Sequence, residues 1–197
     1  QGIPGLSGRT GAAGLDGKPG LDAPLSLSLE LVLVAPDYGN LDRLPTVEIA
    51  ARACKEWWRE NVGINLTISV RCLQSDLVPT GLYTGYLPAL RTLHYWELGG
   101  HTPTVFIFSE YDRVGEGYLG AAFPDLGIAM TVGFGTAPGQ NTILDEIIGH
   151  ELAHILLKSS KHEEGTFLAA ALEEHNRIVT QGQREQLRLA ATQFGGF

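Results

Sequence analysis

Positive charge is scarce in this chain of 197 residues, which has 14 lysines and arginines against 22 aspartates and glutamates and a formal net charge of −8. Proteins that bind nucleic acid need a basic surface to neutralise phosphates, so no nucleic-acid partner is expected. Long hydrophobic runs are also missing. No apolar stretch approaches the roughly 20 residues of a membrane-spanning helix, so no membrane span is expected.

Cysteine is scarce as well, with only Cys54 and Cys72. Two cysteines are too few for the disulfide framework of a small secreted domain. Cys54 lies in the middle of a helical pattern and Cys72 at the end of a strand pattern. We therefore expect two buried thiols, and the alternative of a bridge between them stays open.

Glycine, in contrast, recurs near the N-terminus at positions 2, 5, 8, 11, 14, 17 and 20. These glycines open seven uninterrupted Gly-X-Y triplets, with Pro4 and Pro19 in the Y position. Only glycine fits at the crowded axis of a collagen triple helix, which is why the spacing is strict. A flexible glycine-rich linker, the alternative, has no reason to keep its glycines in register. The pattern predicts a collagen-like triple-helical stem at 1–22 and, with it, a homotrimer.

This pattern resembles the collagen-like stems of animal, bacterial surface and bacteriophage fibre proteins. The resemblance implies an extracellular, cell-surface or virion-associated protein and leaves the organism open. A short hinge at 23–27 follows the stem, where the period of three gives way to a period of two. The predicted organisation is therefore a stem, a hinge and one globular domain at 28–197.

The globular part alternates between strand and helix patterns, in which apolar residues recur at every second position or at every third to fourth position. The expected strands span 26–35, 64–72, 104–108, 117–122 and 128–133, and the expected helices span 45–61, 141–158 and 180–192. Asn141 or Thr142 is the expected cap of the second helix. Thr180 and Gln183 form a capping-box pattern at the third helix. The segment 73–100 is expected to be a long irregular insertion. This order predicts an α/β (α+β) domain with a mixed sheet.

The residues that carry chemistry are His150-Glu151-Leu152-Ala153-His154. His150 and His154 are one helical turn apart, so both imidazoles project from one face and can share a tetrahedral metal ion. Glu151 lies beside them, where its carboxylate can act as general base on a metal-bound water. Two incidental histidines are the alternative. The helix is strongly apolar, however, and buried polar side chains without a metal would need other partners. The motif therefore predicts a Zn²⁺ site.

The order of elements before the motif resembles the metzincin clan of zinc peptidases, and the chain after it adds to the resemblance. Metzincins continue the motif as HExxHxxGxxH and follow it with a Gly-Thr-Leu-Met-like turn and a C-terminal helix. Here Gly165-Thr166-Phe167-Leu168 is similar to the turn, and 180–187 is similar to the start of the last helix. The resemblance covers residues 27–197 and implies a zincin/metzincin-like mixed sheet with an active-site helix and a C-terminal helix.

The chain departs from the metzincin pattern at three positions. Leu157 replaces the glycine that turns the chain back toward the metal, Ser160 falls where the third histidine belongs, and Leu168 replaces the methionine beneath the site. Serine is a poor zinc ligand, so His162, two residues further on, is the expected third ligand. Glu174 is a second candidate because its spacing resembles that of thermolysin-like zincins. A site without a third ligand is the remaining alternative.

The segment Gly120-Ala121-Ala122 resembles the sheet-edge strand along which such peptidases bind an extended substrate. Its small residues leave room for a second backbone, and main-chain pairing would supply affinity. A core strand is the alternative. The other histidines, His94, His101 and His175, have no ligand-like spacing and are expected on the surface.

Two functions follow from these residues. The first is a zinc-dependent endopeptidase that is displayed as a trimer on the stem and cleaves peptides or proteins with Glu151 as general base. The second is a structural or adhesive head domain of a fibre or virion, which keeps a metzincin-like fold with a degenerate metal site. The presence of Glu151 favours the enzyme, because a structural head does not need that carboxylate. Leu157 and Ser160 favour the structural head.

Overall fold

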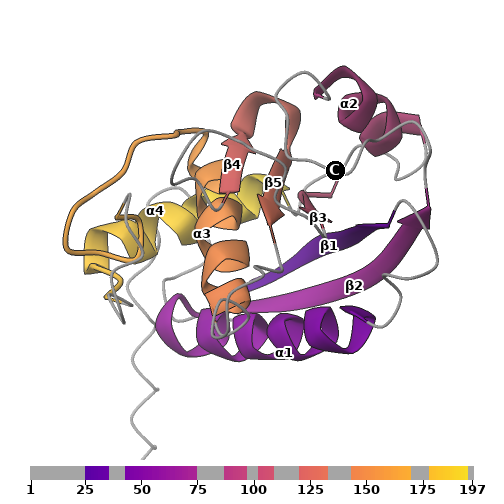
Figure 1. The fold of residues 1–197 in the computed structure, drawn as a ribbon. Helices are drawn as coiled ribbons and strands as arrows, with labels where there is room; N and C mark the ends of the chain where they lie inside the picture. The colour runs from indigo at the N-terminus through magenta and orange to yellow at the C-terminus, as the bar shows by residue number, and fades with distance from the viewer. Residues whose placement is uncertain are drawn as a thin grey trace, which may run out of the picture.

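The computed structural model of the chain describes residues 25–35, 43–74, 87–96, 102–108, 120–132, 143–169 and 178–194. Figure 1 shows these residues as strands that are packed against helices. The expected stem at 1–22 and residues 23–24 of the expected hinge lie outside them, so the collagen-like stem stays a prediction. Residues 25–27, the rest of the expected hinge, are instead part of a strand. Within the described part of the chain, every helix is too short or too polar to span a bilayer.

A mixed five-stranded sheet with the order β2-β1-β3-β5-β4 forms the centre of the domain. Four strands are parallel, namely β1 (Leu25–Ala35), β2 (Ile64–Gln74), β3 (Thr104–Phe108) and β5 (Ile128–Val132). β4 (Gly120–Phe123) is antiparallel to β5 and forms one edge of the sheet. The predicted α/β domain with a mixed sheet is therefore confirmed, and its antiparallel strand lies at an edge.

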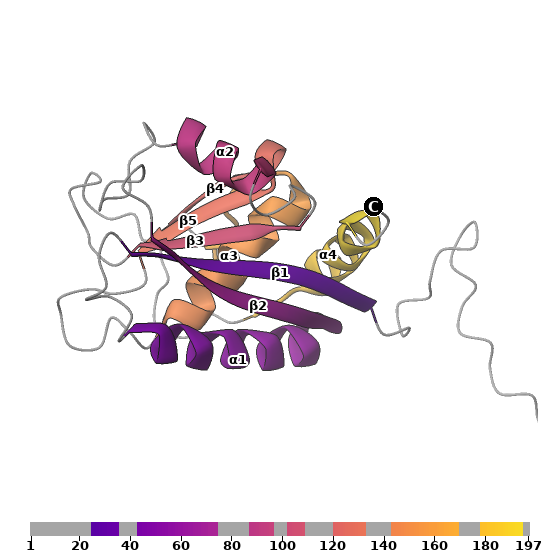
Figure 2. The same ribbon diagram turned by 90° about the vertical axis from the view of Figure 1, so that its right-hand side faces the viewer.

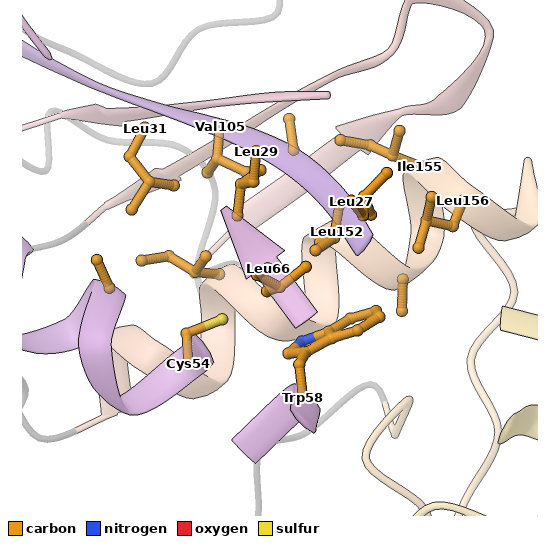
Figure 3. Close-up of a cluster of buried hydrophobic side chains, with 14 of the residues drawn as sticks. Leu27, Leu29, Leu31, Cys54, Trp58, Leu66, Val105, Leu152, Ile155 and Leu156 are labelled. Carbon is orange, nitrogen blue, oxygen red and sulfur yellow. The ribbon is translucent and has the colours of Figure 1, made fainter. Parts of the chain in front are cut away.

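The main hydrophobic core lies between one face of the sheet and the helices α1 (Leu44–Asn61) and α3 (Leu144–Leu157), as Figure 3 shows. Every second residue of β1 faces this core, from Leu27 to Leu33. The opposite face of β1 is polar and exposed at Ser26 and Ser28, but Val32 is buried there beneath α2 (Leu87–Trp96). Apolar and polar residues therefore alternate at the start of β1, and the strand becomes continuously apolar near its end, where helices cover both faces of the sheet.

α1 and α3 approach closely at Trp58 and Gly149. The ring of Trp58 is fully buried. A Cβ atom added at Gly149 would lie 2.9 Å from Trp58 Nε1, closer than van der Waals contact allows. The glycine directly before His150 therefore lets α3 lie against α1.

The C-terminal helix α4 (Gln181–Phe194) is attached to the end of α1 by two arginines. Arg184 Nε donates to Asn61 O at 2.7 Å, and Arg188 donates to Gly63 O. These carbonyls lie at the C-terminus of a helix, where main-chain oxygens lack helical partners and a positive charge is favourable. The capping box at the start of α4 is confirmed, since Gln183 N donates to Thr180 Oγ1 at 3.2 Å.

The expectation of an irregular segment at 73–100 is wrong at 87–96, which form α2. This helix has only 10 residues, near the lower limit at which apolar periodicity identifies a helix. Pro88 in its first turn was the usable signal, because proline lacks the N–H that a first turn leaves unpaired. Figure 2 shows α2 on the face of the sheet opposite α1.

Three smaller expectations are also wrong. His94 was expected on the surface but is buried, and its Nδ1 lies 3.0 Å from Thr104 Oγ1, which compensates for burial. Cys72 is exposed rather than buried, and neither it nor the buried Cys54 forms a disulfide. The N-cap of α3 is Ile143, which has no capping side chain, and Asn141 and Thr142 lie outside the described residues.

Candidate metal centre

The two motif histidines are oriented by main-chain carbonyls that lie beyond their own helix. His150 Nδ1 lies 2.9 Å from Phe167 O, and His154 Nδ1 lies 2.7 Å from Ser159 O. A carbonyl oxygen can only accept, so each Nδ1 carries the proton and donates it. Each Nε2 is therefore left with a free lone pair in the neutral ring.

These two lone pairs face each other, because His150 Nε2 and His154 Nε2 lie 2.9 Å apart. One ring would need a second proton for a hydrogen bond between them. Burial lowers the pKa of His150 to about 4, with the neighbouring His154 and His162 acting in the same direction and the bond to Phe167 O opposing them. Burial also lowers the pKa of His154. At neutral pH both rings are uncharged, and a cation bound between them would relieve the repulsion of the two lone pairs.

His162 reaches the same place from the loop after α3. Ligand nitrogens of His150, His154 and His162 all lie within 4.8 Å of one another. The His162 ring centroid lies 5.4 Å from that of His150 and 5.0 Å from that of His154. The structure thus brings the expected third ligand to the expected pair. The other candidate, Glu174, lies outside the described residues.

Two extra residues, relative to the metzincin spacing, bring His162 into reach. Leu157, at the glycine position of that pattern, is still helical, and the left-handed turn falls one residue later at Lys158, with φ 49°. Ser159 N then donates back to His154 O at 3.2 Å, which closes the helix end. One extra residue therefore extends the helix, and the other extends the loop between Lys158 and His162.

The floor of the site is the turn that resembles the metzincin turn. Gly165 adopts φ 74°, which permits the reversal, and Leu168 is buried in place of the methionine. The Phe167 ring packs on Trp57 of α1 with centroids 5.2 Å apart. This packing holds the Phe167 carbonyl beneath His150.

Glu151 is buried beside the histidines with an unsatisfied carboxylate oxygen. It is 5% exposed, and its Oε2 has no hydrogen-bond partner within the described part of the chain. Burial raises the pKa of this carboxyl to about 8. An unpaired carboxyl is costly to bury, and such groups gather at functional sites.

The edge strand β4 passes directly beside this carboxylate. A Cβ atom added at Gly120 would lie 2.4 Å from Glu151 Oε1, so the glycine leaves the space that the carboxylate occupies. Gly120, Ala121 and Ala122 are all partly exposed, and among the described strands β4 pairs only with β5. The three residues predicted to bind substrate therefore lie in an edge strand rather than a central one, and Gly120 lies beside Glu151.

The residues present fit Zn²⁺. Zinc in catalytic sites takes three protein ligands in a tetrahedral set, and histidine nitrogens bind it at about 2.0–2.1 Å. Two such ligands lie roughly 3.3 Å apart, so the observed 2.9 Å between the Nε2 atoms requires only a slight opening. The hydrogen bonds at both Nδ1 atoms fix the ring orientations, as is usual for zinc-bound histidines.

Sequence reasoning missed the carbonyls of Ser159 and Phe167, which orient the two histidines. Every residue has a main-chain carbonyl, so the residue type does not reveal which carbonyl accepts a hydrogen bond from a histidine. The similarity of 165–168 to the metzincin turn was the only signal that this segment lies beneath the site.

No protein-family model and no curated protein matches the chain. Archaemetzincin from Methanopyrus kandleri matches in structure with a TM-score of 0.53 and 14% identity, over 84% of this chain and 96% of that chain. Archaemetzincin from Archaeoglobus fulgidus, complexed with malonate, has a TM-score of 0.50 and 12% identity, over 81% and 99%. Metalloproteinase-II from Bacteroides fragilis has a TM-score of 0.51 and 10% identity, over 85% and 53%. These likenesses show the fold, and they confirm the predicted metzincin-like fold.

The metal-free protein should become more stable as the pH falls from 8 to 6.5, because of Glu151. Its carboxyl has a pKa of about 8 in the folded state, and its ordinary value, which applies to the unfolded state, is 4.5. Only the folded state therefore binds the proton between pH 8 and 6.5. The contribution is about 2 kcal/mol in the free energy of unfolding. Below pH 6.5, His150 acts in the opposite direction, since its pKa is lowered from 6.5. Urea unfolding in EDTA should show the rise in the wild type and not in Glu151→Gln. An equal rise in both proteins contradicts this assignment.

Gly120→Ala should destabilise the metal-free protein only while Glu151 is present. The new Cβ would lie 2.4 Å from Glu151 Oε1 and displace the carboxylate. We expect a coupling of about 1 kcal/mol between Gly120→Ala and Glu151→Ala in a double-mutant cycle of urea unfolding. Gly182→Ala is the matched control, because nothing lies within 4 Å of its added Cβ. Purely additive effects of Gly120→Ala and Glu151→Ala would rule out the contact.

Proposed function

We propose that the domain at 28–197 is a zinc-dependent peptidase. The observation that carries this proposal is the convergence of three histidine nitrogens within 4.8 Å, next to a buried glutamate. His150, His154 and His162 are the proposed zinc ligands, and Glu151 is the proposed general base. The fold is that of archaemetzincins, which supports the same conclusion.

The proposed chemistry is hydrolysis of a peptide bond. Zn²⁺, when bound, polarises the scissile carbonyl and lowers the pKa of water at the site. Glu151 takes a proton from the attacking water as the new C–O bond forms. It then gives this proton to the amine nitrogen as the C–N bond breaks, which leaves the carboxylate ready for the next cycle. A cation held by the three histidines would lower the pKa of Glu151 below its metal-free value, which would suit the carboxylate to accept the proton.

Strand β4 is the proposed binding site for an extended peptide. Its outer edge has main-chain groups that β5 does not pair, and the small side chains of Gly120, Ala121 and Ala122 allow a second backbone to approach. Gly120 is in contact distance of the Glu151 carboxylate. A peptide paired with β4 would therefore pass the general base.

The decisive experiment combines metal analysis with Glu151→Gln. The wild type should contain about one zinc per chain and cleave peptides from a broad library. Glu151→Gln should lower the turnover by about 10²- to 10⁴-fold, because the amide cannot carry the proton, while zinc content stays the same. Glu146→Gln, in the first turn of the same helix, is the matched control and should cleave normally.

Two outcomes would overturn the proposal. A zinc content below about a tenth of an ion per chain, after preparation with excess zinc, would exclude the metal site. Full zinc content, with wild type and Glu151→Gln equally inert, would instead support the structural or adhesive head domain with a silent site.

We further propose that the domain is displayed as a homotrimer on the collagen-like stem, in an extracellular, cell-surface or virion setting. The Gly-X-Y triplets of 1–22 support this proposal. Sedimentation of the 21.2 kDa chain at low temperature should give three times that mass. Gly11→Val, which places a side chain at the triple-helix axis, should lower the mass toward that of the monomer. A monomeric wild type would refute the trimer.

A further inference from the structure

Gln183 lies where the C-terminal helix α4 meets the loop that carries His162. Its side chain is 4% exposed. Its Oε1 accepts from Thr180 N at 3.0 Å, which completes the capping box. A residue needed only for capping would lie at the surface and leave its amide nitrogen in water, whereas this nitrogen points into the protein.

The amide nitrogen of Gln183 makes two hydrogen bonds to the metal-site loop. Nε2 donates to Glu163 Oε2 at 2.6 Å and to Thr166 Oγ1 at 3.0 Å. Together with the capping bond, these contacts give a partner to the oxygen of the amide and to both of its N–H groups. A fully satisfied buried amide holds its partners in one geometry.

The loop between Glu163 and Leu168 is closed on itself. Glu163 N donates to Leu168 O at 3.0 Å, and Thr166 Oγ1 donates to Glu163 O at 2.8 Å. Gln183 therefore binds a rigid loop rather than a loose side chain. His162 directly precedes this loop, and Phe167, whose carbonyl orients His150, lies within it.

The position of His162 depends on this loop, whereas the positions of the other two histidines are fixed by a helix. His150 and His154 are buried on α3, but His162 is exposed and lies on a segment without regular structure. A side chain binds a metal tightly only if the residues around it already hold it in the position that the metal requires.

We propose that Gln183 is a positioning residue for the third metal ligand and holds His162 at the site through Glu163 and Thr166. This inference rests on the proposed zinc site. It means that the C-terminal helix, through one amide, sets the affinity of the site for its metal. Gln183 itself does not touch the metal or the substrate.

Gln183→Glu separates the two roles of this side chain. Glutamate keeps the oxygen that completes the capping box, but it loses both N–H donors and places a carboxylate against that of Glu163. We expect the Kd for zinc, measured by competition with a chromophoric chelator, to rise by about 10- to 100-fold. The visible spectrum of the Co²⁺-loaded protein should shift toward that of His162→Ala, because both variants lose the third nitrogen.

The chain provides a matched control and a rescue. Gln181→Glu makes the same change on the same helix, also against a glutamate, since Gln181 Nε2 donates to Glu185 Oε1 at 3.0 Å on the exposed side. Its zinc affinity should equal that of the wild type. Combining Gln183→Glu with Glu163→Gln exchanges the two side chains, so that the amide at position 163 can donate to the carboxylate at position 183. This double variant should regain most of the lost affinity.

Three results would overturn the inference while the zinc site itself stands. One is unchanged zinc affinity in Gln183→Glu. Another is an equal loss in Gln181→Glu. The third is the same loss from Gln183→Glu in a His162→Ala background, where no third ligand is left to position. If Gln183→Glu does not fold, Glu163→Ala decides, because Glu163 is exposed and its removal breaks the same contact. A wild type that binds no zinc would instead refute the proposed function.

Discussion

The structure of the site depends on two imidazoles whose unprotonated nitrogens point at each other across 2.9 Å inside the protein. Neutral rings in this arrangement repel, so the fold must hold them in place by other means. It does so with the carbonyls of Ser159 and Phe167, which accept from the opposite ring nitrogens. One carbonyl lies just after the end of α3 and the other in the turn beneath it. The helix end and the turn therefore have to place these two carbonyls within hydrogen-bond distance of the histidines.

The departures from the metzincin pattern are accommodated around this pair. The helix continues through Leu157, and Lys158 takes the left-handed turn that the pattern assigns to glycine. A lysine in that conformation is less favourable than glycine by about 1 kcal/mol, and such strain persists only where the surroundings impose it. Here the main-chain bond from Ser159 N to His154 O fixes the turn, and the longer loop then carries His162 to the site. Leu168 fills the methionine position with a side chain of similar volume.

The remaining polar feature is the carboxyl of Glu151, which is buried with one oxygen unpaired. The edge strand makes room for it at Gly120, where any larger residue would collide with it. A structural head domain would gain stability from an apolar residue in place of this carboxyl. The cost of keeping it supports the proposal of a catalytic role. This argument favours the proposed peptidase over a silent relative, whereas the fold is common to both.

Local sequence determined much of this protein. The spacing of His150 and His154, the alternation in β1 and the Thr180–Gln183 capping box each depend on residues within one or two turns or along one strand, so their patterns could be recognised before the structure was known. Tertiary structure alone decided the rest. His94 is buried with a hydrogen bond to Thr104 of the strand that follows its helix, and the loop after His162 is bonded to Gln183 of α4. These contacts join different elements of the fold, and the energy of such a contact depends on where the fold places both partners.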